Sequence, residues 1–315
     1  MKTAVVLFNL GGPDSLEAVK PFLRNLFSDP AIITLPTLFR LPLARFIASR
    51  RNAKAQKIYA QIGGASPILG QTEMQAQALQ EALASGGKYW DDWRCFVCMR
   101  YWHPMTEEVV QQVRDFAPEQ LVLLPLYPQF STTTTGSSFQ AWDDSVARLG
   151  VTTRRIKSYA TEPGFIAASV ELVKEGLAEL GDQPVRLLFS AHGLPEKIIK
   201  AGDPYQSEVE QTARAIVSAL GEVDWSVCYQ SRVGPLKWIG PATEAEIQRA
   251  AADGKAIVLY PLSFVSEHSE TLVELDIDYR RLAAEEGVPA YVRVPTVGTH
   301  PKFIDGLARL VRDAL

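Results

Sequence analysis

Three carboxylates, Glu270, Glu274 and Asp278, recur at intervals of four residues in the segment SEHSETLVELDIDY. If this segment is helical, positions i, i+4 and i+8 line one face of the helix. A solvated acidic face is the ordinary interpretation, although like charges at this spacing repel one another. The apolar residues between the carboxylates indicate instead that much of the helix is buried. Burial would raise the pKa values of the carboxyl groups and let the row pass protons or hydrated cations.

Glu267 and His268 stand directly before this row and add two potential ligands at its head. Carboxylate and imidazole groups without thiolates suit a divalent ion of borderline softness that is bound only in passing. We therefore predict that the segment from Glu267 to Asp278 conducts protons or metal ions.

The chain has four histidines, and His192 lies where an apolar run ends, in the sequence SAHG. A core histidine that is hydrogen bonded to the backbone is one explanation of such a residue. A position at the end of a strand, with Gly193 next, favours a functional role instead. A neutral imidazole there is a natural proton acceptor near pH 7.

Residues 35–47 (LPTLFRLPLARFI) are apolar but contain two prolines, and a cationic segment with Arg51 follows them. Tyr59 and Ser66 add hydroxyl groups on either side of a Gly-Gly pair. Burial in the core is one explanation of the apolar segment. Alternatively, the apolar segment and the cations after it could form the mouth of a binding site. Such a site would suit a flat ligand with carboxylate tails, because arginine pairs well with carboxylates. Such a mouth is also compatible with transient contact with a membrane.

Several other kinds of site are disfavoured. The net charge of −4 and the interspersed charges argue against nucleic-acid binding. The run Gly11-Gly12-Pro13 matches neither a dinucleotide-binding motif nor a P-loop. Cys95 and Cys98 have CxxC spacing, but they fall in a predicted strand, where residues three apart point to opposite faces. With Cys228 they are interpreted as buried thiols rather than as a disulfide framework, a redox pair or a metal site.

The N-terminal apolar run in MKTAVVLFNLGGPDS is too short for a signal sequence or a membrane span, and no arginine-rich transit peptide precedes it. We expect this run to be the first buried strand and the protein to be cytoplasmic.

Short apolar runs alternate with segments of helical periodicity, a pattern typical of parallel sheets that are covered on both faces. The predicted strands are residues 3–9, 94–100, 120–126, 153–158, 185–190, 225–229, 256–262 and 290–294. The clearest predicted helices are residues 74–84, 163–180, 208–220 and 302–315.

The eight strands fall into two similar sets of four. VLFNLGGP is echoed by LLFSAHGLP, and LLPLYPQFSTTTTGSS by VLYPLSFVSEHSETL. We predict an α/β fold of two similar doubly wound domains, each with a four-stranded parallel sheet. Residues 1–158 and 296–315 would form the first domain, and residues 159–295 the second. Because ligands bind beyond the carboxyl ends of strands in open α/β sheets, we expect the polar strand ends of both domains to line one cleft.

A set of segments spread along the chain resembles ferrochelatases over essentially the whole sequence. The segments are LFNLGGPDSLEAVKPFLRNLFSDP, KIYAQIGGASPI, MRYWHPMTEE, PLYPQFSTTTTGSS, FSAHGLPEK, GDPYQSEV, YQSRVGPLKWIGPAT and SEHSETLVELDIDY. The resemblance implies an enzyme of two similar α/β domains that inserts Fe²⁺ into protoporphyrin IX, bound in the cleft between them. It would release two protons and form protoheme in the last step of heme biosynthesis.

The same resemblance implies roles for individual residues. His192 matches the essential histidine of the family, which accepts pyrrole protons, and Glu270 matches the glutamate that faces it across the cleft. His192 would act on one face of the porphyrin and the acidic row on the other, and both His192 and Glu270 would contact the metal. Glu274 and Asp278 continue the acidic row of the family, in which the third position is commonly glutamate. The residues implied to contact the porphyrin propionates are Arg51, Tyr59 and Ser66. Those implied near the macrocycle are Leu10, Tyr101 and Trp238, and some members of the family have methionine in place of Leu10. Arg100 is also expected to bind the porphyrin.

Some members of the family hold a [2Fe–2S] cluster through a cysteine in the loop after the third strand and a C-terminal cysteine cluster. Here the loop reads Ser131-Thr132-Thr133 and the sequence ends at Leu315 without such a cluster. We therefore expect no iron–sulfur cluster and no other cofactor, with Fe²⁺ as a substrate.

Two alternatives stay open. The protein could be a chelatase that uses coproporphyrin III, another tetrapyrrole or another metal, or it could be a non-catalytic tetrapyrrole carrier. A carrier has no need of an aligned row of carboxylates. The sequence does not distinguish a monomer from a homodimer.

Overall fold

Two four-stranded parallel sheets organise the computed structural model, which describes residues 1–86, 92–146, 150–232 and 236–315. The first sheet has the strand order β2-β1-β3-β4, with β1 (Lys2–Asn9), β2 (Asp92–Met99), β3 (Gln120–Pro125) and β4 (Thr152–Arg155). The second has the order β6-β5-β7-β8, with β5 (Val185–His192), β6 (Asp224–Gln230), β7 (Ala256–Pro261) and β8 (Tyr291–Arg293). All eight predicted strands are confirmed, with ends that differ by a few residues.

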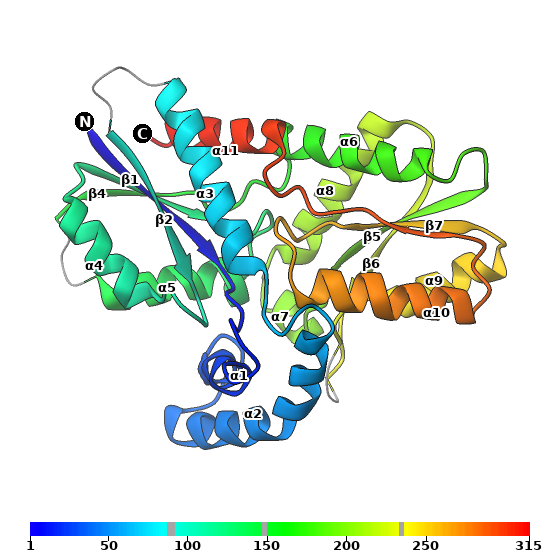
Figure 1. Cartoon of the computed structure of the whole chain (residues 1–315), viewed down its shortest axis with the longest axis horizontal. Coiled ribbons are helices and arrows are strands. Elements are labelled where there is room, and N and C mark those ends of the chain that lie inside the picture. Colours follow the sequence, from blue (N-terminus) through cyan, green and yellow to red (C-terminus); the bar gives the residue numbers. More distant parts are fainter. Residues whose placement is uncertain (87–91, 147–149, 233–235) are drawn as a thin grey trace. The chain divides into compact units, whose positions relative to one another are not determined.

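The two sheets, which Figure 1 draws, have equivalent strand orders, in agreement with the predicted similarity of the two halves. In each, the first strand along the chain lies between the second and the third, and all pairs are parallel. The central strands are buried along nearly their whole length, because helices cover both faces of the sheets. The predicted α/β fold of two similar doubly wound halves is therefore confirmed.

The first half contains six helical elements before β4 among the described residues. They are α1 (Val19–Ser28), α2 (Thr37–Ala60), α3 (Ile68–Ser85), α4 (Thr106–Phe116), the short π-helix η1 (Thr132–Gly136) and α5 (Ser137–Ser145). Helices α4 and α5 pack on one face of the sheet through a cluster that includes Val6, Phe8 and Trp142. Helices α1 and α2 form a separate buried cluster, which includes Tyr59 and Tyr101. This second cluster holds several of the residues predicted to bind a ligand.

In the second half, helices cover both faces of the sheet. They are α6 (Pro163–Ala178), α7 (Glu196–Lys200), α8 (Tyr205–Leu220), α9 (Thr243–Ala252), the π-helix η2 (Glu270–Asp278) and α10 (Tyr279–Glu285). Helices α6 and α8 pack on one face, around Phe189 and Tyr260. Helices α9 and α10 pack with η2 on the other face, around Leu188 and Leu259. The predicted helices at residues 163–180 and 208–220 correspond to α6 and α8.

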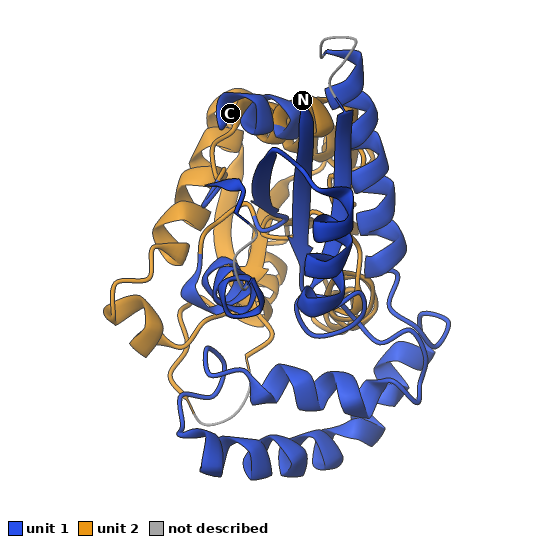
Figure 2. Cartoon of the chain, turned by 90° about the vertical axis from the view of Figure 1, so that its left-hand side faces the viewer, with its two compact units in different colours: residues 1–127, 131–158, 307–315 blue, residues 128–130, 159–306 orange. Residues whose placement is uncertain are grey.

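The chain divides into two units whose limits differ from the predicted domain limits (Figure 2). Unit 1 comprises residues 1–127, 131–158 and 307–315, and unit 2 comprises residues 128–130 and 159–306. The change of unit thus falls inside helix α11 (Pro301–Asp313) instead of at residue 296.

Packing explains why residues 296–306 belong to unit 2. The Phe303 ring lies 5.9 Å from Phe165 and 6.4 Å from Tyr159, measured between centroids. Gly306 lies so close to the carboxylate of Glu162 that a Cβ atom there would be 2.2 Å from Oε2. The chain therefore enters α11 against α6 before it returns to the first unit.

The three cysteines are free thiols. Cys98 and Cys228 are buried, as predicted, whereas Cys95 is half-buried. Burial raises the pKa of each thiol to about 12. Among the residues that the structure describes, no helix combines the length and the apolar character that crossing a membrane requires.

Candidate active site

His192 and Glu270 meet at the carboxyl edge of the second sheet. His192 is the last residue of β5, and Glu270 begins η2 after the loop that follows β7. Because β5 and β7 are neighbours in the sheet and their connections run to opposite sides, this edge is the topological switch point where open α/β sheets bind ligands. The Nδ1 atom of His192 lies 3.2 Å from Oε2 of Glu270. The structure thus brings together the two residues predicted to be catalytic.

Gly193 lets the chain turn directly after His192. Its N–H donates a hydrogen bond of 2.9 Å to the carbonyl of Gln230. A Cβ atom at Gly193 would lie 2.9 Å from that carbonyl oxygen and 3.4 Å from the ring of Trp238. A glycine is therefore needed for β5 and the segment after β6 to approach each other beside His192.

His268 is a third member of this group. Its ring is buried, with Nε2 3.7 Å from Oε2 of Glu270 and the ring centroid 4.7 Å from that of Phe264. The backbone N–H of His268 donates a hydrogen bond to Oγ1 of Thr271, which holds the start of η2. Glu270 thus lies between two imidazoles.

The contact between His192 and Glu270 changes the pKa of both groups. Burial alone would lower the pKa of His192, but the charge and hydrogen bond of Glu270, with a contribution from Glu274, raise it above its ordinary value of 6.5. Burial would raise the pKa of Glu270, but His192 and His268 outweigh it and lower the pKa below its usual range. Both shifts favour an imidazolium–carboxylate pair, which titrates as one unit.

Glu274 is held by the loop after β6. Ser231 donates hydrogen bonds to its carboxylate from the backbone N–H, at 2.8 Å, and from the hydroxyl. The hydroxyl of Tyr279 donates a third, at 3.2 Å. Burial and the nearby charge of Glu270 nevertheless raise the pKa of Glu274, since the hydrogen bonds from Ser231 offset them only in part.

The acidic row lies on a π-helix and not on the α-helix assumed from its spacing. η2 spans Glu270–Asp278, so its hydrogen bonds close larger turns than those of an α-helix. Glu270 and Glu274 are partly buried, while Asp278 is 44% exposed and pairs with Arg281 at 3.1 Å. The row therefore runs from the His192 pair toward solvent.

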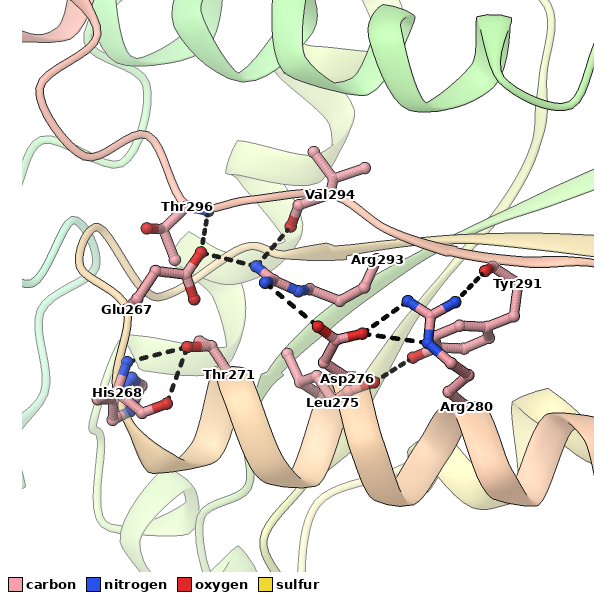
Figure 3. A network of polar contacts seen from close by, with 10 residues as sticks. All are labelled: Glu267, His268, Thr271, Leu275, Asp276, Arg280, Tyr291, Arg293, Val294 and Thr296. Atoms are coloured by element: carbon pink, nitrogen blue, oxygen red, sulfur yellow. Dashed lines mark hydrogen bonds and ion pairs between the residues drawn. The ribbon is translucent and has the colours of Figure 1, made fainter. Parts of the chain in front are cut away.

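Glu267 does not join this row. Its Oε1 atom accepts a hydrogen bond of 2.6 Å from Arg293 and one of 3.0 Å from the N–H of Thr296 (Figure 3). The carboxylate predicted to stand at the head of the path is therefore engaged by an arginine.

In unit 1, Arg100 and Tyr101 share one buried partner, Asp29. The Asp29 carboxylate accepts hydrogen bonds from Nη2 of Arg100 at 2.8 Å and from the Tyr101 hydroxyl at 2.7 Å. It also accepts one from the hydroxyl of Ser137. Tyr101 is only 1% exposed, so its hydroxyl acts inside this network.

The other predicted porphyrin contacts lie on several elements. Tyr59 is buried in the cluster of α1 and α2, while Arg51 is half-buried on α2 with its guanidinium carbon 5.6 Å from the centre of the Phe27 ring. Ser66 and Leu10 are half-buried in the loops before α3 and after β1. These four residues thus belong to unit 1.

Trp238 belongs to unit 2 and lies close to His192 in the fold. It forms a β-bridge with Pro195, and its indole N–H is buried without a hydrogen-bond partner among the described residues. Among those residues, no group of three or more His, Cys, Asp and Glu side chains is arranged to hold a metal ion.

Three residues that contact predicted site residues were missed by the sequence reasoning: Ser231, Asp29 and Arg293. Each contacts a predicted site residue that is far away in the sequence, so the spacing of residues along the chain did not indicate the contact. The one available hint for Ser231 was its place in a polar segment that follows a predicted strand.

Comparison with known proteins assigns the family. A family model named Ferrochelatase matches residues 2–315. The ferrochelatase of Caulobacter vibrioides (strain NA1000 / CB15N) is 56% identical over 316 residues, which cover 100% of this chain and 90% of that protein. The ferrochelatase of Wolbachia sp. subsp. Drosophila simulans (strain wRi) is 52% identical over 316 residues, which cover 98% of each chain.

Solved structures show the same fold at low sequence identity. SirB from Bacillus subtilis with Fe³⁺ has a TM-score of 0.57 and 13% identity, covering 100% of this chain and 96% of that chain. CbiX, the terminal enzyme for biosynthesis of siroheme in denitrifying bacteria, has a TM-score of 0.52 and 16% identity, with both chains covered completely. These structures show that the fold is shared. The family model over residues 2–315 and the relatives at 52% and 56% identity show that this chain belongs to the ferrochelatase family.

Proposed function

We propose that this protein inserts Fe²⁺ into protoporphyrin IX and releases the two pyrrole protons, which gives protoheme in the last step of heme biosynthesis. The observation that carries the proposal is the contact of His192 with Glu270, at the switch point of the second sheet and at the head of a carboxylate row. The ferrochelatase match over residues 2–315 supports the same reaction. Fe²⁺ is a substrate here, and the charge of the dication balances the two protons that leave.

His192 and Glu270 were expected to act on opposite faces of the porphyrin, but their contact favours action from the same side. A flat ring needs about 3.5 Å to the atoms on each of its faces, so groups on opposite faces lie roughly 7 Å apart. The 3.2 Å between His192 Nδ1 and Glu270 Oε2 leaves no room for a ring between them. Since Nδ1 is engaged by Glu270, Nε2 is the nitrogen of His192 that meets a pyrrole N–H.

The pair must release a proton before His192 can accept one. The pKa of His192 is raised and that of Glu270 is lowered, so the resting pair holds a proton on the imidazole. Glu274, the next carboxylate in the row, has a raised pKa and takes up a proton more readily than Glu270. We assign to Glu274 and Asp278 the transfer of protons from the pair toward solvent.

Porphyrin binding is assigned to the same residues as in the sequence analysis, with two restrictions. Arg51 and Ser66 are half-buried and can offer polar groups to propionates, and Trp238 lies beside Gly193 next to the catalytic histidine. Tyr59 and Tyr101 are buried, so Tyr59 supports the site through packing and Tyr101 through its hydrogen bond to Asp29. We propose that no iron–sulfur cluster takes part, because burial disfavours the thiolate form of each cysteine.

We propose a cytoplasmic protein that contacts the membrane surface through α2. Free thiols agree with a reducing compartment. On α2, Leu38 is 79%, Phe39 63% and Phe46 59% exposed, and the sequence of this helix contains arginine and lysine but no aspartate or glutamate. An exposed apolar and cationic helix suits an anionic bilayer.

Sedimentation with vesicles tests the membrane contact. Vesicles rich in phosphatidylserine are expected to carry down the wild type, and Phe39→Asn is expected to weaken the association. Met74→Asn is the matched control, because Met74 is 50% exposed on α3. Equal sedimentation of both variants, or binding to neutral vesicles alone, would contradict the proposal.

An anaerobic absorbance assay tests the reaction. Protoporphyrin IX and Fe²⁺ are expected to give the protoheme spectrum with multiple turnovers. Parallel reactions with Co²⁺, Zn²⁺ and coproporphyrin III distinguish a chelatase of other specificity, which would turn over faster with one of these substrates. A spectral shift on porphyrin binding without any metal insertion would identify a carrier and refute the proposed function.

A further inference from the structure

An ion-pair network with a largely buried centre, formed by Arg293 and Glu267, links strand β8 to the segment that carries Glu270 (Figure 3). Nη1 of Arg293 donates a hydrogen bond of 2.6 Å to Oε1 of Glu267, and its Nη2 lies 3.6 Å from Oδ2 of Asp276. Glu267 precedes Glu270 by three positions, and Asp276 follows it by six. One arginine thus holds two carboxylates that bracket the catalytic glutamate.

A second set of contacts ties the same helix to the same strand. Arg280 donates to Oδ1 of Asp276 at 2.6 Å and to the carbonyl of Tyr291 at 2.8 Å. The hydroxyl of Tyr291 donates to the carbonyl of Leu275 at 2.6 Å. The C-terminal half of η2 is therefore fastened to β8 by side chains from both elements.

The composition of the network favours a role in conformation over one in stability. The side chains of Arg293 and Glu267 are 10% and 15% exposed. The Nε atom of Arg293 and the Oε2 atom of Glu267 are buried and have no hydrogen-bond partner among the described residues. A buried ion pair that leaves polar atoms unsatisfied is a weak source of stability, and selection of one conformation is the better explanation.

The conformation that the network favours is the π-helix of η2, which is unusual. η2 is a π-helix of nine residues, and such helices are rare and occur mostly at functional sites. Because a π-helix advances around its axis by a smaller angle per residue than an α-helix, the direction of Glu270 relative to Asp276 depends on this geometry. Fixing Glu267 and Asp276 therefore fixes the direction in which Glu270 points.

We propose that Arg293 is a positioning residue for the His192–Glu270 pair, which it aligns by anchoring Glu267 and Asp276 on either side of Glu270. No contact of Arg293 with either member of the pair is involved. It also neutralises Glu267 and, with Arg280, Asp276, so that Glu270 and Glu274 are the carboxylates left to respond to His192. The kinetic part of this proposal rests on the proposed function, and the structural part does not.

The test compares Arg293→Met with Arg186→Met. Arg186 is also buried in unit 2 and pairs with Asp224 at 2.8 Å and with Asp253 at 2.9 Å, but it lies at the opposite end of β5 from His192. Both variants lose a buried ion pair and are expected to melt at a lower temperature. Only Arg293→Met is expected to lower kcat for iron insertion, by about tenfold to a hundredfold, since small misplacements of reacting groups have effects of this size. KM for protoporphyrin is expected to stay within about twofold.

A second readout does not depend on turnover. The ring ¹⁵N resonances of His192 in the porphyrin-free protein report whether Glu270 engages Nδ1. They are expected to change in Arg293→Met and to stay unchanged in Arg186→Met. Arg293→Lys keeps a cation at this position and is expected to recover part of kcat.

Asp276→Asn keeps the test decisive if Arg293→Met does not fold. Asp276 is less buried than Glu267. The variant weakens the longer arm of Arg293 and the contact with Arg280 but keeps the contact of Arg293 with Glu267, so a smaller change in the same direction is expected. The proposal is overturned if Asp276→Asn and Arg293→Met leave kcat and the His192 resonances at their wild-type values. It is also overturned if Arg186→Met changes both to the same extent. A response of the resonances in a protein that inserts no iron would uphold the positioning role and refute the proposed function.

Discussion

The carboxylate of Glu274 accepts hydrogen bonds from both the backbone N–H and the hydroxyl of Ser231. Ser231 has φ of 60°, in the left-handed region that non-glycine residues rarely occupy. In this backbone conformation the N–H and the hydroxyl of Ser231 both point toward the carboxylate of Glu274. Because the pKa of Glu274 is nevertheless raised and that of Glu270 is lowered, the second position of the row takes up a proton before the first.

Glu274→Gln is expected to stabilise the fold at alkaline pH while it slows iron insertion. An unfolded glutamate ionises with a pKa of about 4.3, whereas folded Glu274 keeps its proton to higher pH. The native state therefore loses stability as the pH rises from the unfolded to the folded pKa. Glutamine carries no charge, so the variant is expected to melt a few degrees above the wild type at pH 8 and at the same temperature at pH 4. Calorimetry at both pH values checks this.

Asp278→Asn is the control for that experiment. Asp278 ends the same row but is 44% exposed, so its replacement is expected to change the melting temperature little at either pH. A Glu274→Gln protein that melts below the wild type at pH 8 would show that its hydrogen bonds outweigh the cost of its buried charge.

Glu270→Gln is expected to lower the pKa of His192. The negative charge and hydrogen bond of Glu270 raise this pKa, and burial, which lowers it, would then dominate. Activity needs a neutral imidazole, so it increases as the pH rises through the pKa of His192. The acidic limb of the pH–rate profile is therefore expected above pH 6.5 in the wild type and at lower pH in the variant, with a lower plateau. NMR titration of His192 measures the same shift, and an unchanged titration would contradict the assigned contact.

His192→Ala is expected to bind protoporphyrin but to insert iron about 10² to 10⁴ times more slowly, the usual contribution of a general base. Fluorescence titration measures binding, and the anaerobic assay measures insertion. His103→Ala is the matched control, because His103 is exposed and pairs with Glu108 of α4. Near-normal turnover of His192→Ala would refute the role of proton acceptor.

Local sequence pattern was sufficient to predict the strands, their two equivalent sets and the positions of His192 and Glu270. Buried parallel strands are apolar runs, and residues at strand ends meet at a predictable edge. Spacing of four residues did not distinguish a π-helix from an α-helix, because both bring i and i+4 near each other. The helix type depends on tertiary anchors such as Arg293 and Ser231, which lie on other elements.

The sequence also could not predict which side chain each glutamate pairs with. Glu267 and Glu270 are three residues apart and chemically identical, yet one pairs with Arg293 and the other with His192. The family resemblance identified the residues, but only the tertiary structure showed which carboxylate is neutralised by a cation. The predicted common cleft, the absence of a cluster and the individual porphyrin contacts stay predictions.

Tyr101→Phe is expected to destabilise unit 1 by about 1 to 3 kcal/mol without a large change in KM for protoporphyrin, because buried Asp29 loses one of its donors. Urea denaturation measures the loss. Tyr260→Phe is the matched control, since the buried Tyr260 hydroxyl donates to Ser169 at 2.7 Å in unit 2. A hydroxyl that contacts the macrocycle would give the opposite pattern for Tyr101→Phe, with a raised KM and nearly unchanged stability. The two variants together thus distinguish a tyrosine that supports the site through Asp29 from one that binds the substrate.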